Sequence, residues 1–103
     1  TWNIGNGTIV DEVATGFTST DWNYIVGTFD TDYMRIYING IQANSKDTAL
    51  TSIANNENFT IGVSRDTYYP FNGLIDDVRI YNYARTPAQI LIDYNQGLGA
   101  RFK

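Results

Sequence analysis

The stretch from Tyr33 to Gly40 constrains the fold more than any other part of the sequence. Apolar side chains alternate along it with polar or aromatic ones, which is typical of a strand with one buried face. The apolar positions are Met34, Ile36 and Ile38. Asn39-Gly40 is the preferred pair for a two-residue type I′ turn, because both central residues need positive φ. The sequence therefore predicts a β-hairpin whose returning strand begins at Ile41.

Other short runs of β-branched and aromatic residues lie between turn-forming residues, which favours an antiparallel, mainly β domain. The strands we expect are 8–13, 21–29, 33–39, 41–43, 59–63 and 71–81, with a short one at 49–53 inside a polar loop. Gly73 and the Asp76-Asp77 pair interrupt the alternation of the last strand. Either Ile75 faces the opposite side there, or a bulge near the two acids resets the register.

One helix is predicted near the end of the sequence. Thr86 suits the N-cap, Pro87 the first helical position and Gln89 the third residue of a capping box. Gly97 is a typical stop signal. The expected helix spans 87–96, with an apolar stripe that can lie over the end of a sheet.

Composition excludes several classes of function. With 103 residues and 43% hydrophobic residues, the chain has room for one small packed domain. Its 7 basic and 11 acidic residues give a net charge of −4, so binding of nucleic acid through the phosphate backbone is not expected. The sequence contains no Cys or His, which removes thiolate and imidazole chemistry. Membrane insertion is not expected either, because no apolar run approaches the roughly 20 residues that span a bilayer.

Residues 73–82, followed by a short link at 84–86 and the predicted helix, resemble laminin-G-like domains of the concanavalin A-like lectin/glucanase superfamily. Residues 22–30 are similar to the tryptophan strand of that family, and 35–40 to the strand and hairpin after it. The resemblance covers residues 22–96 and implies an all-β jelly roll, an antiparallel β-sandwich, with one short C-terminal helix. Members are mostly secreted or cell-surface proteins that bind glycans or proteins, often with a structural calcium ion.

Length separates this sequence from full members of the family. They have about twice as many strands as we count here, and the sequence matches only their C-terminal half. Sheets of a jelly roll combine strands from both halves, so the missing strands would leave edges unpaired. We therefore expect residues 1–103 to be a single domain that lacks its N-terminal strands, a fragment completed by the missing half or by another chain.

The resemblance points to Asp76 and Asp77 as candidate metal residues. Calcium prefers carboxylate and carbonyl oxygens, and an aspartate near a bulge can supply both. In the family, the first acid of the pair is associated with a structural ion or with a buried hydrogen-bond network. Asp76 therefore has two interpretations of equal weight, a calcium ligand and an acceptor of backbone N–H bonds.

The loop that contains Asp66, Tyr68 and Tyr69 is the candidate ligand site. Tyrosine faces stack on pyranose rings, and aspartate can hold sugar hydroxyls. Packing against the core is the alternative role for the tyrosines. Calcium-dependent relatives carry a longer acidic loop at this place, so a solvated aspartate is the simpler interpretation of Asp66.

These features predict a non-catalytic, extracellular or cell-surface module of a larger protein that binds a glycan or a surface protein. Glycan-hydrolysing relatives carry paired carboxylates on an inner strand, and Glu12 and Glu57 are the only glutamates here. The alternative is a structural module for protein contacts or self-assembly in a surface layer or filament, without a sugar site.

Overall fold

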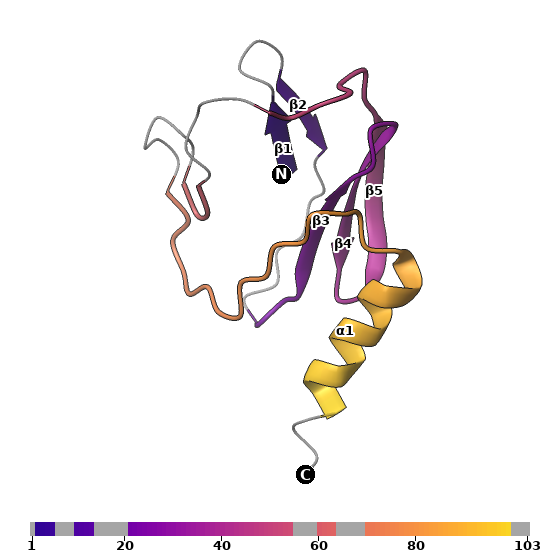
Figure 1. Ribbon diagram of the computed structural model, residues 1–103. Helices are drawn as coiled ribbons and strands as arrows, with labels where there is room; N and C mark the ends of the chain where they lie inside the picture. The colour runs from indigo at the N-terminus through magenta and orange to yellow at the C-terminus, as the bar shows by residue number, and fades with distance from the viewer. Residues whose placement is uncertain (1, 6–9, 14–20, 55–59, 64–69, 100–103) are drawn as a thin grey trace.

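The structure is a computed structural model that describes residues 2–5, 10–13, 21–54, 60–63 and 70–99 (Figure 1). The described residues form two antiparallel sheets and a helix near the C-terminus. The elements are β1 (Trp2–Gly5), β2 (Val10–Val13), β3 (Ile25–Phe29), β4 (Tyr33–Ile38), β5 (Ile41–Asp47) and α1 (Pro87–Gly99).

The larger sheet has the order β3-β4-β5 and is antiparallel throughout. The predicted hairpin between β4 and β5 is confirmed, with φ of 53° at Asn39 and 86° at Gly40. β5 continues to Asp47, further than expected, and the short strand predicted at 49–53 is wrong. The register shifts where Ile36 pairs with Asn44 and the next residue of β4 pairs with Gln42. This irregularity is a β-bulge on β5, and bulges bend and twist the strand that carries them.

The N-terminal hairpin supplies part of the core beneath this sheet. β1 pairs with β2, and β1 was not among the expected strands. The buried cluster consists of Ile4, Val13, Met34, Ile36 and Leu50, with Phe29 packed against it. Met34 and Ile36 are thus buried as the alternation predicted, because the hairpin β1–β2 covers their face of β4.

The opposite face of β4 is buried at Tyr37, although Tyr33 on the same face is exposed. Tyr37 has the other parity from Met34 and Ile36, yet it is only 2% exposed, and Ile90 of α1 is fully buried. The helix lies against the β4–β5 turn, at the end of the sheet away from the N-terminal hairpin (Figure 1). Tyr24 before β3 stacks on Tyr94 of α1, with 6.0 Å between ring centroids.

Two of the predicted strands are wrong. Residues 60–63 and 70–81 are described, and neither segment is a strand. An extended segment becomes a strand only when its backbone groups pair with a neighbour. Asp77 also interrupts the second segment, because its φ of 55° is left-handed. The helix, in contrast, is longer than predicted and passes Gly97 to end at Gly99.

The mainly β class and the C-terminal helix therefore agree with expectation. The described residues do not amount to the two full sheets of a jelly roll. Among these residues, no helix is long and apolar enough to cross a membrane.

Candidate functional site

The predicted site residues fall in two places. Asp66, Tyr68 and Tyr69 belong to residues 64–69, which lie outside the described part of the chain. Asp76 and Asp77 belong to the exposed extended segment 70–81. The structure therefore gives the geometry of the predicted metal site but not of the predicted ligand loop.

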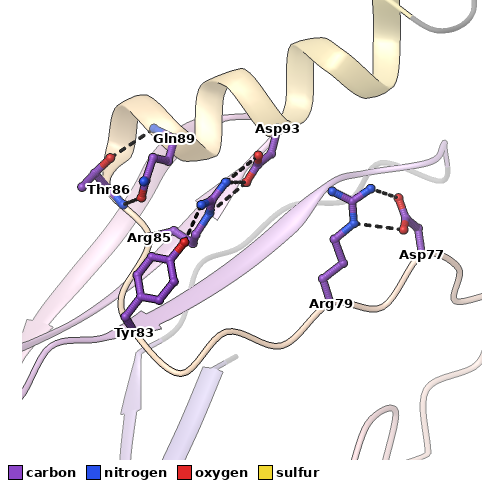
Figure 2. A network of polar contacts seen from close by, with 7 residues as sticks. All are labelled: Asp77, Arg79, Tyr83, Arg85, Thr86, Gln89 and Asp93. Carbon is purple, nitrogen blue, oxygen red and sulfur yellow. Dashed lines mark hydrogen bonds and ion pairs between the residues drawn. The ribbon is translucent and has the colours of Figure 1, made fainter.

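Asp77 is engaged by an arginine. Its two carboxylate oxygens accept hydrogen bonds from Nε and Nη2 of Arg79, each at 3.2 Å (Figure 2). This hydrogen bonding raises the pKa of the Arg79 guanidinium. The backbone N–H of Asp77 in turn donates to Oδ1 of Asp76 at 2.8 Å. The irregularity expected near the acids is thus a left-handed residue stabilised by local hydrogen bonds.

These two acids do not by themselves fit a calcium ion. Calcium takes six to eight oxygen ligands, and the described residues contain no group of three acidic side chains that could hold a metal. The Arg79 guanidinium occupies the oxygens of Asp77 and would repel a cation there. Calcium binding at Asp76 stays a prediction that requires further oxygens from elsewhere.

The most extensive polar network described lies between segment 70–81 and the helix, and it is centred on Arg85. Nη2 of Arg85 donates to both carboxylate oxygens of Asp93 at 2.7 Å, and Nη1 donates to the Tyr83 hydroxyl at 2.7 Å. The guanidinium carbon also lies 4.5 Å from the centroid of the Tyr81 ring. We call these residues the Arg85 cluster: Tyr81, Tyr83, Arg85 and Asp93 (Figure 2 draws the last three).

The Arg85–Asp93 pair of this cluster is largely shielded from solvent, whereas Tyr81 and Tyr83 are exposed. The Arg85 and Asp93 side chains are 17% and 9% exposed, against 53% and 68% for Arg79 and Asp77. Hydrogen bonding to Asp93 raises the pKa of Arg85, which keeps it charged at any ordinary pH. This arginine therefore ties the segment that precedes the helix to α1. The sequence analysis missed this role, although an arginine immediately before an N-cap and an acid on the helix are a usable signal.

The ion pairs of Arg35 and Arg79 are local. Arg35 of β4 binds Asp30 of the preceding turn at 2.6 Å, and its guanidinium lies over the Tyr33 ring. Oδ1 of Asp30 also accepts from the backbone N–H groups of Asp32 and Tyr33. Arg35 and Arg79 thus pair with acids that are close in sequence rather than on a neighbouring strand.

The flanks of the predicted ligand loop are held together. Phe71 N–H donates to the Gly62 carbonyl at 2.6 Å. Gly62 has a φ of 79°, and a Cβ there would lie 3.0 Å from Cδ1 of Ile75. Thr60 Oγ1 donates to the Val63 carbonyl at 2.9 Å. Residues 62 and 71, one on each side of the predicted loop, are therefore adjacent in space.

Comparison with known proteins gives one family and one solved structure to report. The family described as the concanavalin A-like lectin/glucanases superfamily matches residues 1–91. A crystal structure of an S-layer domain-containing protein from Clostridium thermocellum is similar to this chain, with a TM-score of 0.58 and 23% sequence identity. The similarity covers 84% of this chain and 44% of that chain, so this sequence spans less than half of the matched chain. No curated protein matches.

Proposed function

Since this chain belongs to the concanavalin A-like lectin/glucanase superfamily, we propose that it is a non-catalytic, extracellular carbohydrate-binding or adhesion module of a larger protein. The family match over residues 1–91 carries the proposal. The sequence adds support, because its only glutamates, Glu12 and Glu57, do not form the paired carboxylates of a strand-borne hydrolase site.

We place the sugar contact at the loop that carries Asp66, Tyr68 and Tyr69. Its base is closed by the hydrogen bond from Phe71 to the Gly62 carbonyl, and a closed base reduces the entropy lost when a loop binds a ligand. Two adjacent tyrosines offer aromatic faces, and the aspartate offers a hydroxyl acceptor. The acidic net charge of −4 favours neutral over anionic glycans.

A glycan array, run with calcium and again with excess chelator, tests the proposal. The variants Tyr68→Ala and Tyr69→Ala should lose binding to every glycan that the parent chain binds. Tyr33→Ala is the matched control, since Tyr33 is an exposed tyrosine at the start of β4 and lies outside the loop. Absence of binding under both conditions would contradict the proposal.

The alternative function is structural: a module for protein contacts or self-assembly in a surface layer or filament. It is favoured by the similar crystal structure, which comes from an S-layer domain-containing protein. This function predicts no glycan binding at any calcium concentration. It also predicts concentration-dependent assembly of the parent protein, measured by light scattering.

We propose a structural calcium ion at Asp76 as a separate, testable property. Calcium should raise the melting temperature, and excess chelator should reverse the increase. Asp76→Asn should abolish the increase, whereas Asp77→Asn should spare it because Asp77 is held by Arg79. An unchanged melting temperature in calcium would remove calcium from the description of this domain.

A further inference from the structure

Asn-Gly is a chemically reactive dipeptide as well as a turn former, and the sequence contains it three times. Glycine has no side chain, so its backbone nitrogen can reach the side-chain carbon of the preceding asparagine, and asparagine is a thermolabile residue for this reason. Asn39-Gly40 and Asn72-Gly73 lie within the described residues, and Asn6-Gly7 lies outside them. The first two pairs share one chemistry in different surroundings, so the structure allows a direct comparison.

The reaction is deamidation through a cyclic imide. The glycine nitrogen attacks Cγ of the asparagine and forms an N–Cγ bond, and its proton passes to a base in the solvent. The Cγ–Nδ2 bond then breaks, and ammonia leaves. Water opens the resulting five-membered succinimide at either carbonyl and gives aspartate or isoaspartate. The sequence of steps consumes water and releases ammonia, and nothing is oxidised or reduced.

Asn39-Gly40 is held away from this reaction by the fold. Both residues have positive φ in the β4–β5 turn, Gly40 is buried, and a Cβ there would lie 3.0 Å from Cδ1 of Leu91. Asn39 Oδ1 accepts a hydrogen bond from Tyr24 N–H at 2.9 Å, and Nδ2 donates to Oδ1 of Asn23 at 3.1 Å. Attack on Cγ therefore requires the side chain to leave both partners and the turn to open.

Asn72-Gly73 stands in different surroundings. Both residues are exposed, and neither has a positive φ, so the pair does not form the turn seen at Asn39. Within the described part of the chain, no hydrogen bond holds the Asn72 side chain. The Phe71 ring packs beside Gly73, but Phe71 is itself 59% exposed. The pair lies in segment 70–81, the extended trace shown in orange in Figure 1, where little local structure has to open before the peptide can rearrange.

We propose that Asn72 is a site of spontaneous deamidation in this protein, and that the fold protects Asn39 from the same modification. The product adds a negative charge to a chain whose net charge is −4. It does so next to Phe71, whose N–H donates to the Gly62 carbonyl at the base of the predicted ligand loop. Isoaspartate also lengthens the main chain by a methylene group just after Phe71. The inference concerns the chemistry of the chain and does not depend on the proposed glycan site.

Peptide mapping by mass spectrometry tests the proposal without any substitution. The purified, folded protein is incubated at mildly alkaline pH, and the deamidated forms of each Asn-Gly peptide are quantified over time. Asn72 should deamidate at least about tenfold faster than Asn39, because Asn39 reacts only when its turn opens. Equal rates at the two sites, or a faster reaction at Asn39, would overturn the proposal.

The same incubation in denaturant is the control for local sequence. Once the chain is unfolded, the two sites should react at similar rates, because both are then Asn-Gly pairs in water. A rate ratio that did not change on unfolding would come from the preceding residues, Ile38 and Phe71, and not from the fold. That result would also overturn the proposal.

One variant checks the assignment to Asn72. Asn72→Gln keeps a side-chain amide, but attack on the longer side chain would close a less favourable six-membered ring. Deamidation of the peptide that contains residue 72 should therefore stop, while the rate at Asn39 stays the same. Persistent deamidation of that peptide in Asn72→Gln would place the reaction at another residue and overturn the assignment.

Discussion

Individual ion pairs in this chain differ sharply in how much solvent surrounds them. Arg79–Asp77 is an exposed pair within segment 70–81, whereas Arg85–Asp93 joins that part of the chain to the helix and is mostly shielded. Exposed pairs add little to stability, because water and salt screen them. Removal of one partner from a shielded, bidentate pair leaves a charge without compensation.

Asp93→Asn should therefore lower the melting temperature by several degrees. The variant leaves the Arg85 guanidinium mostly covered and without its counter-charge. Asp77→Asn is the matched control and should change the melting temperature little, because its pair is exposed. Equal effects of the two substitutions, measured by thermal unfolding at one salt concentration, would contradict this assignment.

Asp30 should make stability depend on pH in the acidic range. Burial acts to raise the pKa of this carboxyl, but hydrogen bonds from Arg35, Tyr33 and Asp32 outweigh it and lower the pKa below its ordinary value of 3.8. A lowered pKa means that the folded state prefers the charged form. The stabilisation is then present above about pH 4 and is lost as the pH falls through the folded-state pKa.

The test is a comparison of Asp30→Asn with the parent chain by chemical denaturation across pH. The variant should lose up to about 1 kcal/mol at pH 7, a value limited by the partial exposure of the pair. The difference should shrink as the pH falls below about 4 and through the folded-state pKa. If the difference in unfolding free energy between the two chains did not change with pH, it would come from lost neutral hydrogen bonds and not from the charge of Asp30.

Two elements, the helix and the β4–β5 hairpin, are stabilised by specific interactions at one end. The helix begins at a complete capping box, in which Thr86 N–H donates to Gln89 Oε1 at 3.0 Å and Gln89 N–H donates to Thr86 Oγ1 at 3.2 Å (Figure 2). The β4–β5 hairpin ends at a turn whose residues are left-handed. Asn39 also accepts a hydrogen bond from Tyr24 N–H and donates to the Tyr24 carbonyl, so the turn is tied to the residue before β3.

Thr86→Ala should cost about 1 kcal/mol of stability and reduce helicity, because it leaves a backbone donor at the start of α1 unsatisfied. Circular dichroism and thermal unfolding give the two readouts. Thr51→Ala, at an exposed position outside the strands and the helix, is the control and should change neither. An effect of Thr51→Ala equal to that of Thr86→Ala would contradict the capping explanation.

Gly40→Ala should destabilise the hairpin by about 1–2 kcal/mol, the cost of holding a residue with a Cβ in a left-handed conformation. Contact adds to this cost, since a Cβ at Gly40 would lie 3.0 Å from Cδ1 of Leu91. Adding Leu91→Ala to Gly40→Ala should remove the part of the stability loss that comes from the contact with Leu91. The part that comes from the left-handed conformation should stay. A double-mutant cycle measured by chemical denaturation separates the two, and strict additivity would exclude the contact.

The molecule as a whole is built on a three-stranded sheet whose central strand β4 has buried residues on both faces, whereas every residue of the edge strand β5 is exposed. The N-terminal hairpin covers one face of β4 through Ile4 and Val13, and the other face contains the buried Tyr37. A hydrophobic face, or packing against a helix, is what gives a small sheet its stability. Segment 70–81, in contrast, is exposed along its whole length, so the apolar side chains of the molecule are unevenly buried.

Ile4→Ala should lower the free energy of unfolding by about 2–5 kcal/mol, because it opens a cavity in the main core. Ile41→Ala should cost far less, since Ile41 is mostly exposed. Chemical denaturation of the two variants provides the measurement. A small loss at Ile4 would mean that the N-terminal hairpin is not part of the cooperative unit.

The sequence predicted best those elements that depend on near neighbours. The Asn39-Gly40 turn, the burial of Met34 and Ile36, and the Thr86–Gln89 capping box each rest on a few consecutive residues, and all three are confirmed. The site was less predictable. Arg79 engages Asp77 and Arg85 engages Asp93, and neither contact follows from residue type alone.

The failed strand predictions share a physical cause. Residues 60–63 and 71–81 have suitable side chains, but strand formation also depends on a partner strand, which a local sequence pattern does not identify. β1 shows the reverse case, because its pairing with β2 makes a strand from residues whose own pattern was too short to recognise. Local pattern thus indicates which segments are able to form strands, and the available partners decide which of them do.

The packing of α1 on the β4–β5 turn has a consequence for relatives of this chain. A Cβ at residue 40 would meet Leu91 at 3.0 Å and Tyr94 at 3.1 Å, so the absence of a side chain at that position sets how closely the helix approaches. Evolution can then change these positions only together. A related sequence with a larger residue at position 40 should carry a smaller one at position 91 or 94, and that covariation would be visible in an alignment without any structure.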